Sequence, residues 1–332
     1  MGSVIYEYKG TSADIEVCGF GGMITVRFHT GERDVSPLFE RDWERSEDAF
    51  MNYLRGDFFS TPFGANPEDF SRFPSAWREL EKPFDREANF LHGYGAHHCW
   101  KLKEWLKNGL VMEISYPEDE MIEGVTRRIT ASEEVCRVDF LDEITIRKDG
   151  WLPLGLHPIF KLSGQEGMTE LTLPDCQGIR TYPVPADESS IFVPDQWVRD
   201  VRRVPLKKGG TVDALRLPLA ERTEELLLLC NVEKPEVTLH NKEEDYRVRL
   251  TWDGALLKHC LLWMCNRGNR ARPWNGDTLC LGVEPIMAAF DLGEVISAGE
   301  NPLKKEGMCT CVKVGQGEVL SLFHRMELLE GR

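Results

Sequence analysis

Alternation of hydrophobic and polar residues along short segments is the feature that most restricts the fold of this chain. Hydrophobic side chains occupy every second position at Ile24, Val26 and Phe28, and again from Tyr246 to Trp252. An extended strand places successive side chains on opposite faces, whereas a helix repeats about every 3.6 residues. No rhythm of strands separated by long helices is present. The pattern therefore predicts antiparallel strands that each bury one face.

Two short polar turns predict hairpins. Asn108-Gly109 separates strand-like residues 100–105 from 110–116, and Asp253-Gly254 separates the strand ending at Trp252 from residues 255–263. Asn-Gly and Asp-Gly pairs suit the left-handed backbone of a two-residue hairpin turn. Further strand-like runs occupy residues 135–140, 144–147, 171–173, 237–240, 278–283 and 308–314. We therefore predict an all-β chain with two short hairpins.

One segment, residues 46–55, has the signals of a helix. Ser46 is a suitable N-cap, Glu47 and Asp48 place negative charge in the first turn, and Gly56 is a suitable stop. A few short helices of this kind would connect strands without forming a layer of their own.

The chain has 332 residues, which suffices for two average domains or for one large β domain. No linker rich in proline and serine, no abrupt change of composition and no fixed-period repeat divides it. We therefore predict a single domain over residues 1–332. Residues 184–210 and 267–276 are typical of loops that leave the sheets, and loops at one rim are where a site is expected.

Charge and cysteine content restrict the partners and the compartment. The formal net charge of -15 disfavours non-specific binding to nucleic acid or to an anionic membrane surface. No segment resembles a secretory signal or a membrane span. Ten cysteines without a Cys-x-x-Cys pair are typical of reduced thiols. We expect a cytoplasmic monomer or homodimer with no nucleic-acid or membrane partner.

Two titratable residues stand in apolar, strand-like surroundings. His157 lies in Gly155-Leu-His157-Pro-Ile-Phe160, and Glu284 lies in Leu-Gly-Val-Glu284-Pro285. A lone histidine in such a run is often a core residue, but burying a carboxylate is costly unless something pairs with it or uses it. If the fold brings the two together, one can protonate a bound substrate while the other deprotonates it.

A third segment around His92 combines glycine, histidine and aromatic residues. Glycines allow close approach of the backbone to a ligand, and histidine with aromatic rings suits contacts to hydroxyl groups and sugar rings. His97 and His98 are adjacent, so on a strand they would point to opposite faces, unlike the His-x-His pair of metal-binding β-barrels. We therefore expect no metal site here.

The order of three motifs resembles the galactose mutarotase-like superfamily, the aldose 1-epimerases and their relatives. The motifs are Leu91-His92-Gly93, then Gly155-Leu-His157-Pro158-Ile-Phe160-Lys-Leu162, then Gly282-Val-Glu284-Pro285. Residues 56–66 resemble the early substrate loop of that family, and Trp263 with Pro273-Trp274-Asn275 resembles the approach to the glutamate strand. The resemblance covers residues 56–292 and implies a large antiparallel β-supersandwich with its site on a concave sheet face.

The resemblance also implies roles for residues. His157 would be the general acid and Glu284 the general base. Asn66 is followed by Pro67 where the family has an arginine, and no motif marks the aspartate with which the family contacts sugar hydroxyls. The expected substrate contacts are His92, Asn66, Trp274, Asn275 and Arg270.

These residues predict an isomerase that interconverts the anomers of a cyclic sugar. The reaction removes a proton from the anomeric hydroxyl and adds one to the ring oxygen, so one base and one acid suffice and no cofactor is required. Arg267, Arg270 and Arg272 precede Trp274, and arginine recognises phosphate and carboxylate groups. One alternative is therefore an epimerase for an anionic sugar, a sugar phosphate or a uronate. Another is a non-catalytic carbohydrate-binding protein of the same fold.

Overall fold

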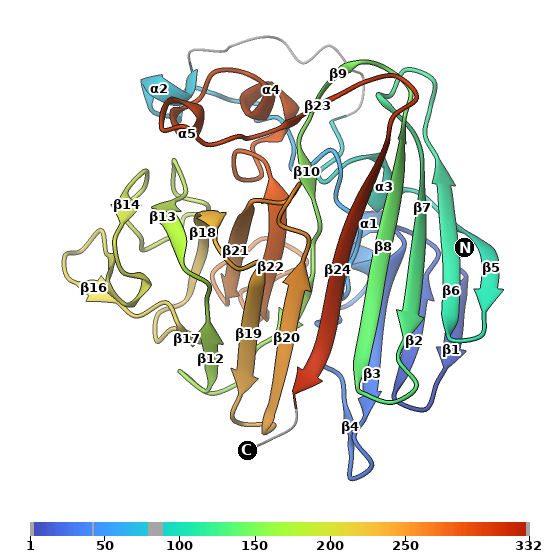
Figure 1. The fold of residues 1–332 in the computed structure, drawn as a ribbon. Helices are drawn as coiled ribbons and strands as arrows, with labels where there is room; N and C mark the ends of the chain where they lie inside the picture. The colour runs from blue at the N-terminus through green and yellow to red at the C-terminus, as the bar shows by residue number, and fades with distance from the viewer. Residues whose placement is uncertain (1–2, 42, 79–88, 330–332) are drawn as a thin grey trace.

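The structure is a computed structural model that describes residues 3–41, 43–78 and 89–329. Within these residues the strands form antiparallel sheets of nine, seven and four strands and two ladders of two strands. Figure 1 shows the nine-stranded sheet in one layer, with the other two large sheets behind it. The fold is the all-β antiparallel sandwich that the alternation predicts.

The nine-stranded sheet contains the clearest examples of period-two burial. In β20 the residues Tyr246, Val248, Leu250 and Trp252 are buried and their neighbours are partly exposed, as predicted. The hairpin predicted at Asn108-Gly109 is also confirmed, with its turn one residue earlier at Lys107-Asn108, because Leu106 of β5 pairs with Gly109 of β6. In spatial order the strands are β17 (Arg216–Leu217), β12 (Thr169–Thr172), β19 (Glu236–Asn241), β20 (Tyr246–Trp252), β24 (Val319–Leu329), β8 (Arg137–Ile146), β7 (Ile122–Ala131), β6 (Gly109–Ser115) and β5 (Lys101–Leu106).

The second layer contains the seven-stranded sheet, with strands β10 (Leu154–Gly155), β22 (Leu279–Met287), β21 (His259–Asn266), β18 (Thr223–Val232), β13 (Cys176–Thr181) and β14 (Trp197–Val198), and with β11 (Ile159–Lys161) also paired to β22. The four-stranded sheet contains β1 (Ile5–Lys9), β2 (Ala13–Cys18), β3 (Met23–His29) and β4 (Asp34–Val35). The small ladders pair β15 (Val204–Pro205) with β16 (Thr211–Val212), and β23 (Val312–Val314) with β9 (Gly150–Leu152).

The predicted hairpin at Asp253-Gly254 is wrong. β20 pairs with β19 and β24 in one sheet, whereas β21 pairs with β18 and β22 in the other. The turn is wider than a two-residue turn. Two hydrogen bonds hold it: the Trp252 indole donates to the carbonyl of Leu257, and the Asp253 carboxylate accepts from the amide of Ala255. The chain therefore crosses here from one layer to the other.

Short helices connect the strands. They are α1 (Ala49–Tyr53), α2 (Ser75–Arg78), α3 (Tyr94–His97), α4 (Gly293–Ala298), α5 (Pro302–Lys305) and the 3-10 helix η1 (Val201–Arg203). The helix predicted at residues 46–55 exists as α1, but its N-cap is Asp48 and not Ser46. The Asp48 carboxylate accepts from the amide of Phe50, while Asn52 holds the backbone of Ser46 outside the helix.

The strands of the seven-stranded sheet are apolar on both faces at its centre, and this positions the site. Leu227, Leu262 and Val283 face the main core between the layers. The opposite face carries Leu228 and Ile286, which pack under a second cluster that includes residues following β22. A strand covered on both sides loses the simple alternation, and residues in β18 and β22 are almost all buried.

Two further features concern membrane spans and cysteines. Among the described helices, none has both the length and the apolar character needed to cross a membrane. All ten cysteines lie within the described residues, and each carries a free thiol.

Candidate active site

Strand register gathers polar side chains on the covered face of the seven-stranded sheet. Leu226 lies opposite Trp263, which lies opposite Gly282. Glu224 is two residues before Leu226, and Glu284 is two residues after Gly282. Because cross-strand partners share a face and the period along a strand is two, these side chains all point away from the main core.

His157 is placed by the chain between β10 and β11. Gly155 pairs with Ile286 and Ile159 pairs with Gly282, so the same register puts His157 opposite Glu284. Backbone hydrogen bonds on either side maintain this alignment, from Leu156 N to Pro285 O at 3.1 Å and from Val283 N to Pro158 O at 2.9 Å. The two residues are far apart in the sequence, but the ladder makes them cross-strand neighbours.

The imidazole and the carboxylate are in contact. His157 Nε2 lies 3.4 Å from Glu284 Oε1, and the two side chains are only 6% and 2% exposed. Gly282 leaves the space that the carboxylate occupies, because a Cβ atom at that position would lie 2.2 Å from Glu284 Oε1. Phe58 stacks on the His157 ring with centroids 4.6 Å apart, which fixes the orientation of the ring.

A cavity of about 380 Å³ opens over this pair. This volume lies in the range of about 300 to 1,000 Å³ that is usual for small-molecule sites. Its walls come from α1, from the face of β18, β21 and β22, and from several loops. The lining residues are Phe50, Met51, Leu54, Phe58, Leu91, His92, His157, Ala186, Asp187, Glu224, Leu226, Trp263, Asn269, Trp274, Glu284 and Asp291.

Several polar atoms of this cavity are buried without a hydrogen-bond partner among the described residues. They are Glu284 Oε1, Asp291 Oδ1, Glu224 Oε2, His92 Nδ1 and His157 Nδ1. Buried polar atoms in proteins are almost always paired, so such a concentration calls for an explanation. A ligand that carries several hydroxyl groups would supply the missing donors and acceptors.

Burial controls the protonation of the site. It lowers the pKa of His157 to about 3 and the pKa of His92 well below its usual value. Burial, reinforced by the charge of Asp291, raises the pKa of Glu284 well above its usual value. Burial also raises the pKa of Glu224 to about 7. Without a ligand, the cavity therefore favours neutral His157 and protonated Glu284.

His92 reaches the cavity from the loop before α3. Its backbone is left-handed, with φ of 66°, and its amide donates to the carbonyl of Gly64 at 3.0 Å. The His92 ring packs edge-on against His157 with centroids 4.5 Å apart, and Phe63 packs on it from another side. The structure thus brings this predicted contact residue to the cavity.

Trp274 and Trp263 form an aromatic wall. Their ring centroids are 5.7 Å apart at an angle of 80°, and Trp43 supports Trp274 from behind at 4.7 Å. The indole nitrogen of Trp263 donates to Glu224, which turns that carboxylate toward the cavity. Trp274 was predicted as a contact, and it lines the cavity.

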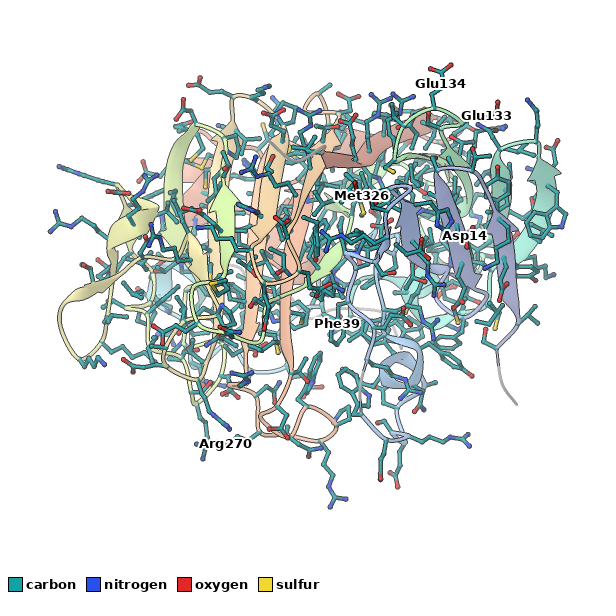
Figure 2. All side chains as sticks on the ribbon, turned by 90° about the horizontal axis from the view of Figure 1, so that it is seen from below. Asp14, Phe39, Glu133, Glu134, Arg270 and Met326 are labelled. Carbon is teal, nitrogen blue, oxygen red and sulfur yellow. The ribbon has the colours of Figure 1, made fainter. Side chains whose placement is uncertain are left out.

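Three other predicted contacts do not line the cavity. Asn66 instead connects two loops, since its Oδ1 accepts from Val295 N at 2.8 Å and its backbone amide donates to Asn89 Oδ1. Asn275 is exposed, and its side chain donates to the carbonyl of Pro273. Arg270 is also exposed, and Figure 2 shows it at the periphery of the molecule.

Three carboxyl groups of the cavity were missed in the sequence, Asp187 in a loop and two others in apolar stretches. Glu224 lies at the start of a leucine-rich run in β18, and Asp291 follows Ala-Ala-Phe after β22. Each is an acidic residue within an apolar stretch, the same signal that marked Glu284. Glu225 has this signal as well, but it points to the other face and caps the amides of Ile191 and Phe192.

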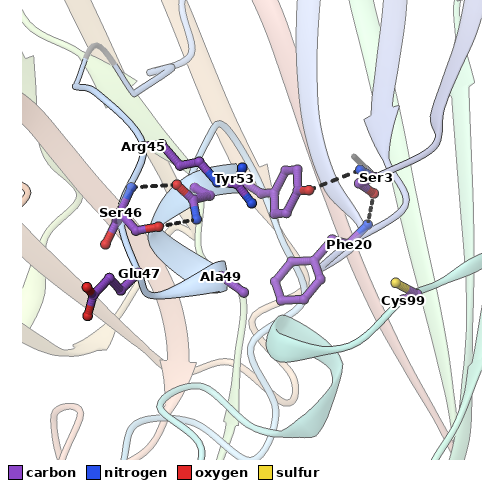
Figure 3. A pocket seen from close by; sticks show the side chains of 9 residues that line it. Ser3, Phe20, Arg45, Ser46, Glu47, Ala49, Tyr53 and Cys99 are labelled. Atoms are coloured by element: carbon purple, nitrogen blue, oxygen red, sulfur yellow. Dashed lines mark hydrogen bonds between the residues drawn. The ribbon is translucent and has the colours of Figure 1, made fainter. Parts of the chain in front are cut away.

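A second, more open hollow lies against the other residues of α1 (Figure 3), with a volume of about 620 Å³. Its polar groups satisfy one another: Phe20 N donates to Ser3 Oγ, and Ser3 N donates to the Tyr53 hydroxyl. None of the unpaired buried atoms found in the described residues belongs to it. Nor do the described residues contain a group of three or more metal-ligating side chains arranged around an ion.

Comparison with known proteins identifies the fold. No protein-family model and no curated protein matches the chain. Among solved structures, an aldose epimerase homologue from C. elegans is 14% identical with a TM-score of 0.64, covering 100% of both chains. A candidate aldose 1-epimerase from Escherichia coli K12 is 15% identical with a TM-score of 0.66, covering 99% of each chain. A galactose mutarotase related enzyme from Lactobacillus acidophilus is 11% identical with a TM-score of 0.59, covering 98% of each.

These identities are low, so the likeness establishes the fold and leaves the chemistry to the site itself. The fold is that of the galactose mutarotase-like β-sandwiches, which is the fold that the sequence resemblance implies. In this chain the site is a cavity where an imidazole and a carboxylate touch and where further carboxylate oxygens lack a hydrogen-bond partner among the described residues.

Proposed function

We propose that this protein is a cofactor-free sugar mutarotase, an isomerase that interconverts the anomers of a cyclic sugar. The observation that carries the proposal is the 3.4 Å contact between His157 Nε2 and Glu284 Oε1 beneath a cavity of suitable size. The two oxygens that exchange protons in this reaction are bonded to one carbon atom. An adjacent acid and base can therefore reach both at once.

The reaction needs two proton transfers in each direction. Glu284 takes the proton of the anomeric hydroxyl, the bond between the anomeric carbon and the ring oxygen breaks, and His157 gives a proton to the ring oxygen. The open-chain aldehyde then rotates about the bond next to its carbonyl group. Reversal of the two transfers closes the ring on the other face, and both side chains return to their starting states. Positioned acids and bases contribute about 10²- to 10⁴-fold each.

The pair needs a single proton to do this. Neutral His157 with protonated Glu284 holds the same number of protons as charged His157 with ionised Glu284. Burial favours the first arrangement in the empty cavity, because it lowers the pKa of His157 and raises that of Glu284. A sugar hydroxyl that donates to the carboxylate favours the second, and the proton need only cross from Glu284 to His157.

Other lining residues would hold the sugar. Trp263 and Trp274 offer aromatic surface to the apolar face of a pyranose. Glu224 and His92 have unpaired atoms that can accept from or donate to hydroxyl groups. Asn66 would act indirectly, by holding the loop before His92 in place.

The cavity favours a neutral sugar over an anionic one. None of the described arginines and lysines lines it, and four carboxyl groups do: Asp187, Glu224, Glu284 and Asp291. Arg267 instead donates to the carbonyl of Gly164. A phosphate or carboxylate group would lie among carboxyl groups, with no arginine or lysine in the described lining to bind it, so the neutral sugar is the better candidate.

Anomer exchange in freshly dissolved pure α-glucose and α-galactose, followed by polarimetry or proton NMR, tests the proposal. We expect wild-type protein to accelerate the exchange, Glu284→Gln and His157→Ala to abolish the acceleration, and His240→Ala on β19 to leave it unchanged. Acceleration that survives both site variants would overturn the assignment. Sugar binding in calorimetry without any acceleration would favour the non-catalytic alternative.

A further inference from the structure

The mechanism leaves two carboxyl groups of the cavity, Asp187 and Asp291, without a role. Asp291 lies in the turn that follows β22, and its Oδ1 atom is buried without a partner among the described residues. It lines the same cavity as Glu284. An acid placed this close to the catalytic pair affects the energy of every charge in it.

The backbone is held so that Asp291 points into the cavity. Its carbonyl accepts from the amide of Ala65 at 3.0 Å. Gly64 makes this approach possible, since a Cβ atom there would lie 2.1 Å from the Asp291 carbonyl oxygen. Phe290 is fully buried and has a left-handed backbone with φ of 54°, which is unfavourable for an aromatic residue. Such strain persists where the surrounding structure enforces it, and it is concentrated at functional sites.

The side chain is also oriented. The Tyr182 hydroxyl is hydrogen-bonded to the Asp291 carboxylate, and this contact lowers the pKa of Asp291 against the larger, opposite effect of burial. Tyr182 itself packs edge-on against Phe290 with centroids 5.3 Å apart. Tyr182, the strained turn and the loop at Gly64 therefore all fix the Asp291 carboxylate in the cavity that Glu284 also lines.

We propose that Asp291 is a positioning residue for the proposed reaction. Tyr182 holds the Asp291 carboxylate, and the negative charge of Asp291 retains the proton that His157 and Glu284 share and makes Glu284 a stronger base. The inference rests on the proposed function for its catalytic consequence. A nearby negative charge opposes ionisation of Glu284, and a base of higher pKa accepts a proton from a sugar hydroxyl more readily.

The surroundings of Glu284 support this effect. The other titratable groups around it are His157 from the adjacent ladder, Cys260 on the other face of β21, and Glu224 and His92 in the cavity lining. Burial keeps both histidines uncharged, and the Cys260 thiol is neutral because burial raises its pKa. Among the neighbours, Asp291 is the one whose charge raises the pKa of Glu284.

The test compares the pH profiles of kcat/KM in wild-type, Asp291→Asn and Tyr182→Phe proteins and in the double variant. Activity ends at high pH where the pair loses its last proton, which comes from Glu284. Removing a nearby charge shifts such a pKa by about one unit or more, so we expect the alkaline limit in Asp291→Asn to move down by about one pH unit. Tyr182→Phe makes Asp291 easier to protonate, so it should move the limit in the same direction but less. The double variant should match Asp291→Asn alone.

Asp277→Asn removes an equal charge from an exposed position outside the cavity and serves as the control, with no shift expected. Superimposable profiles for wild-type and Asp291→Asn, both folded, would overturn the inference. If wild-type protein accelerates no sugar, the proposed function fails separately. The inference is then decided by carbon-13 NMR titration of labelled glutamate, in which Glu284→Gln identifies the Glu284 signal. A lower Glu284 pKa in Asp291→Asn supports the inference, and an unchanged one refutes it.

Discussion

Replacement of Gly282 by alanine tests whether the position of the Glu284 carboxylate, and not merely its presence, determines activity. Gly282 is on β22 two residues before Glu284 and shares its face. A Cβ atom at this position would lie 2.2 Å from Glu284 Oε1 and 3.1 Å from Glu284 Cδ. It would also lie 3.2 Å from Trp263 Cβ, which belongs to the neighbouring strand and has little room to move. The carboxylate is therefore the group that must give way.

The size of the effect follows from these distances. Ordinary contacts to a Cβ atom begin near 3.4 Å, so the oxygen must retreat by about 1 Å, and a misplacement of that size can cost about 10²-fold in rate. Stability should change little, because alanine recovers about 0.5 to 1 kcal/mol of backbone entropy that glycine loses in a strand. This gain offsets part of the crowding at Trp263. We expect kcat to fall about a hundredfold while the free energy of unfolding stays within about 1 kcal/mol of wild type.

The assay is polarimetric anomer exchange, combined with urea unfolding and with sugar binding by calorimetry. Gly164→Ala is the matched control, since its new methyl group would meet only the Glu243 carboxylate at 3.8 Å. In a Glu284→Gln background, Gly282→Ala should cause no additional loss, because both changes act through one side chain. Full activity in folded Gly282→Ala protein would refute the view that this carboxylate must stand where it does.

Three other changes probe the wall, the buried acid and the exposed arginine. Trp274→Ala removes an aromatic contact that contributes about 0.5 to 1.5 kcal/mol to sugar binding. KM should therefore rise up to about tenfold in steady-state kinetics, with kcat less affected. Glu224 has a pKa of about 7 in the folded protein and about 4.5 in the unfolded chain. Protonated Glu224 therefore favours the folded state at low pH, and this contribution to stability is lost as pH rises from about 4.5 to 7. Glu224→Gln should therefore gain up to about 3 kcal/mol relative to wild type in urea unfolding at pH 8, and no such gain at pH 4. Arg270→Ala should change KM for glucose and for glucose 6-phosphate less than about twofold, because an exposed charge outside the cavity contributes little.

Much of the fold was predictable because strands with one buried and one exposed face alternate hydrophobic and polar residues. The alternation in β3 and β20 and the Asn108-Gly109 pair correctly predict local strands and one hairpin. Asp253-Gly254 shows the limit of this reasoning, since two residues determine that the chain turns but not which sheet receives it. Pairing partners depend on contacts between distant segments, and a local pattern contains no record of them.

The part of the candidate site that could be predicted consists of titratable residues within apolar segments. His157 and Glu284 are polar residues in apolar strands, and the fold places them in contact. Asn275 and Arg270 belong to a loop whose course the sequence does not specify, and both point to solvent. Glu224 and Asp291 face the cavity because of strand register and a strained turn, and neither feature could be read before the pairing of β18, β21 and β22 was known.

A continuous series of backbone hydrogen bonds explains why His157 and Glu284 are so well fixed. Ile24 of β3 exchanges backbone hydrogen bonds with Asp57, and Phe58 accepts from the amide of His157, so one continuous ladder runs from the four-stranded sheet to β22. Asp57 is anchored in turn by an ion pair with Arg127 and by His324 Nε2 at 3.1 Å, all fully buried. Burying such charges stabilises a fold little, and removing one partner is strongly destabilising, so the cluster tolerates few arrangements. It therefore locks the segment that carries Phe58, and through the stacked rings it holds the imidazole against its carboxylate. The proposed reaction would need this rigidity, because its two proton transfers act on oxygens of a single carbon and leave little tolerance for displacement.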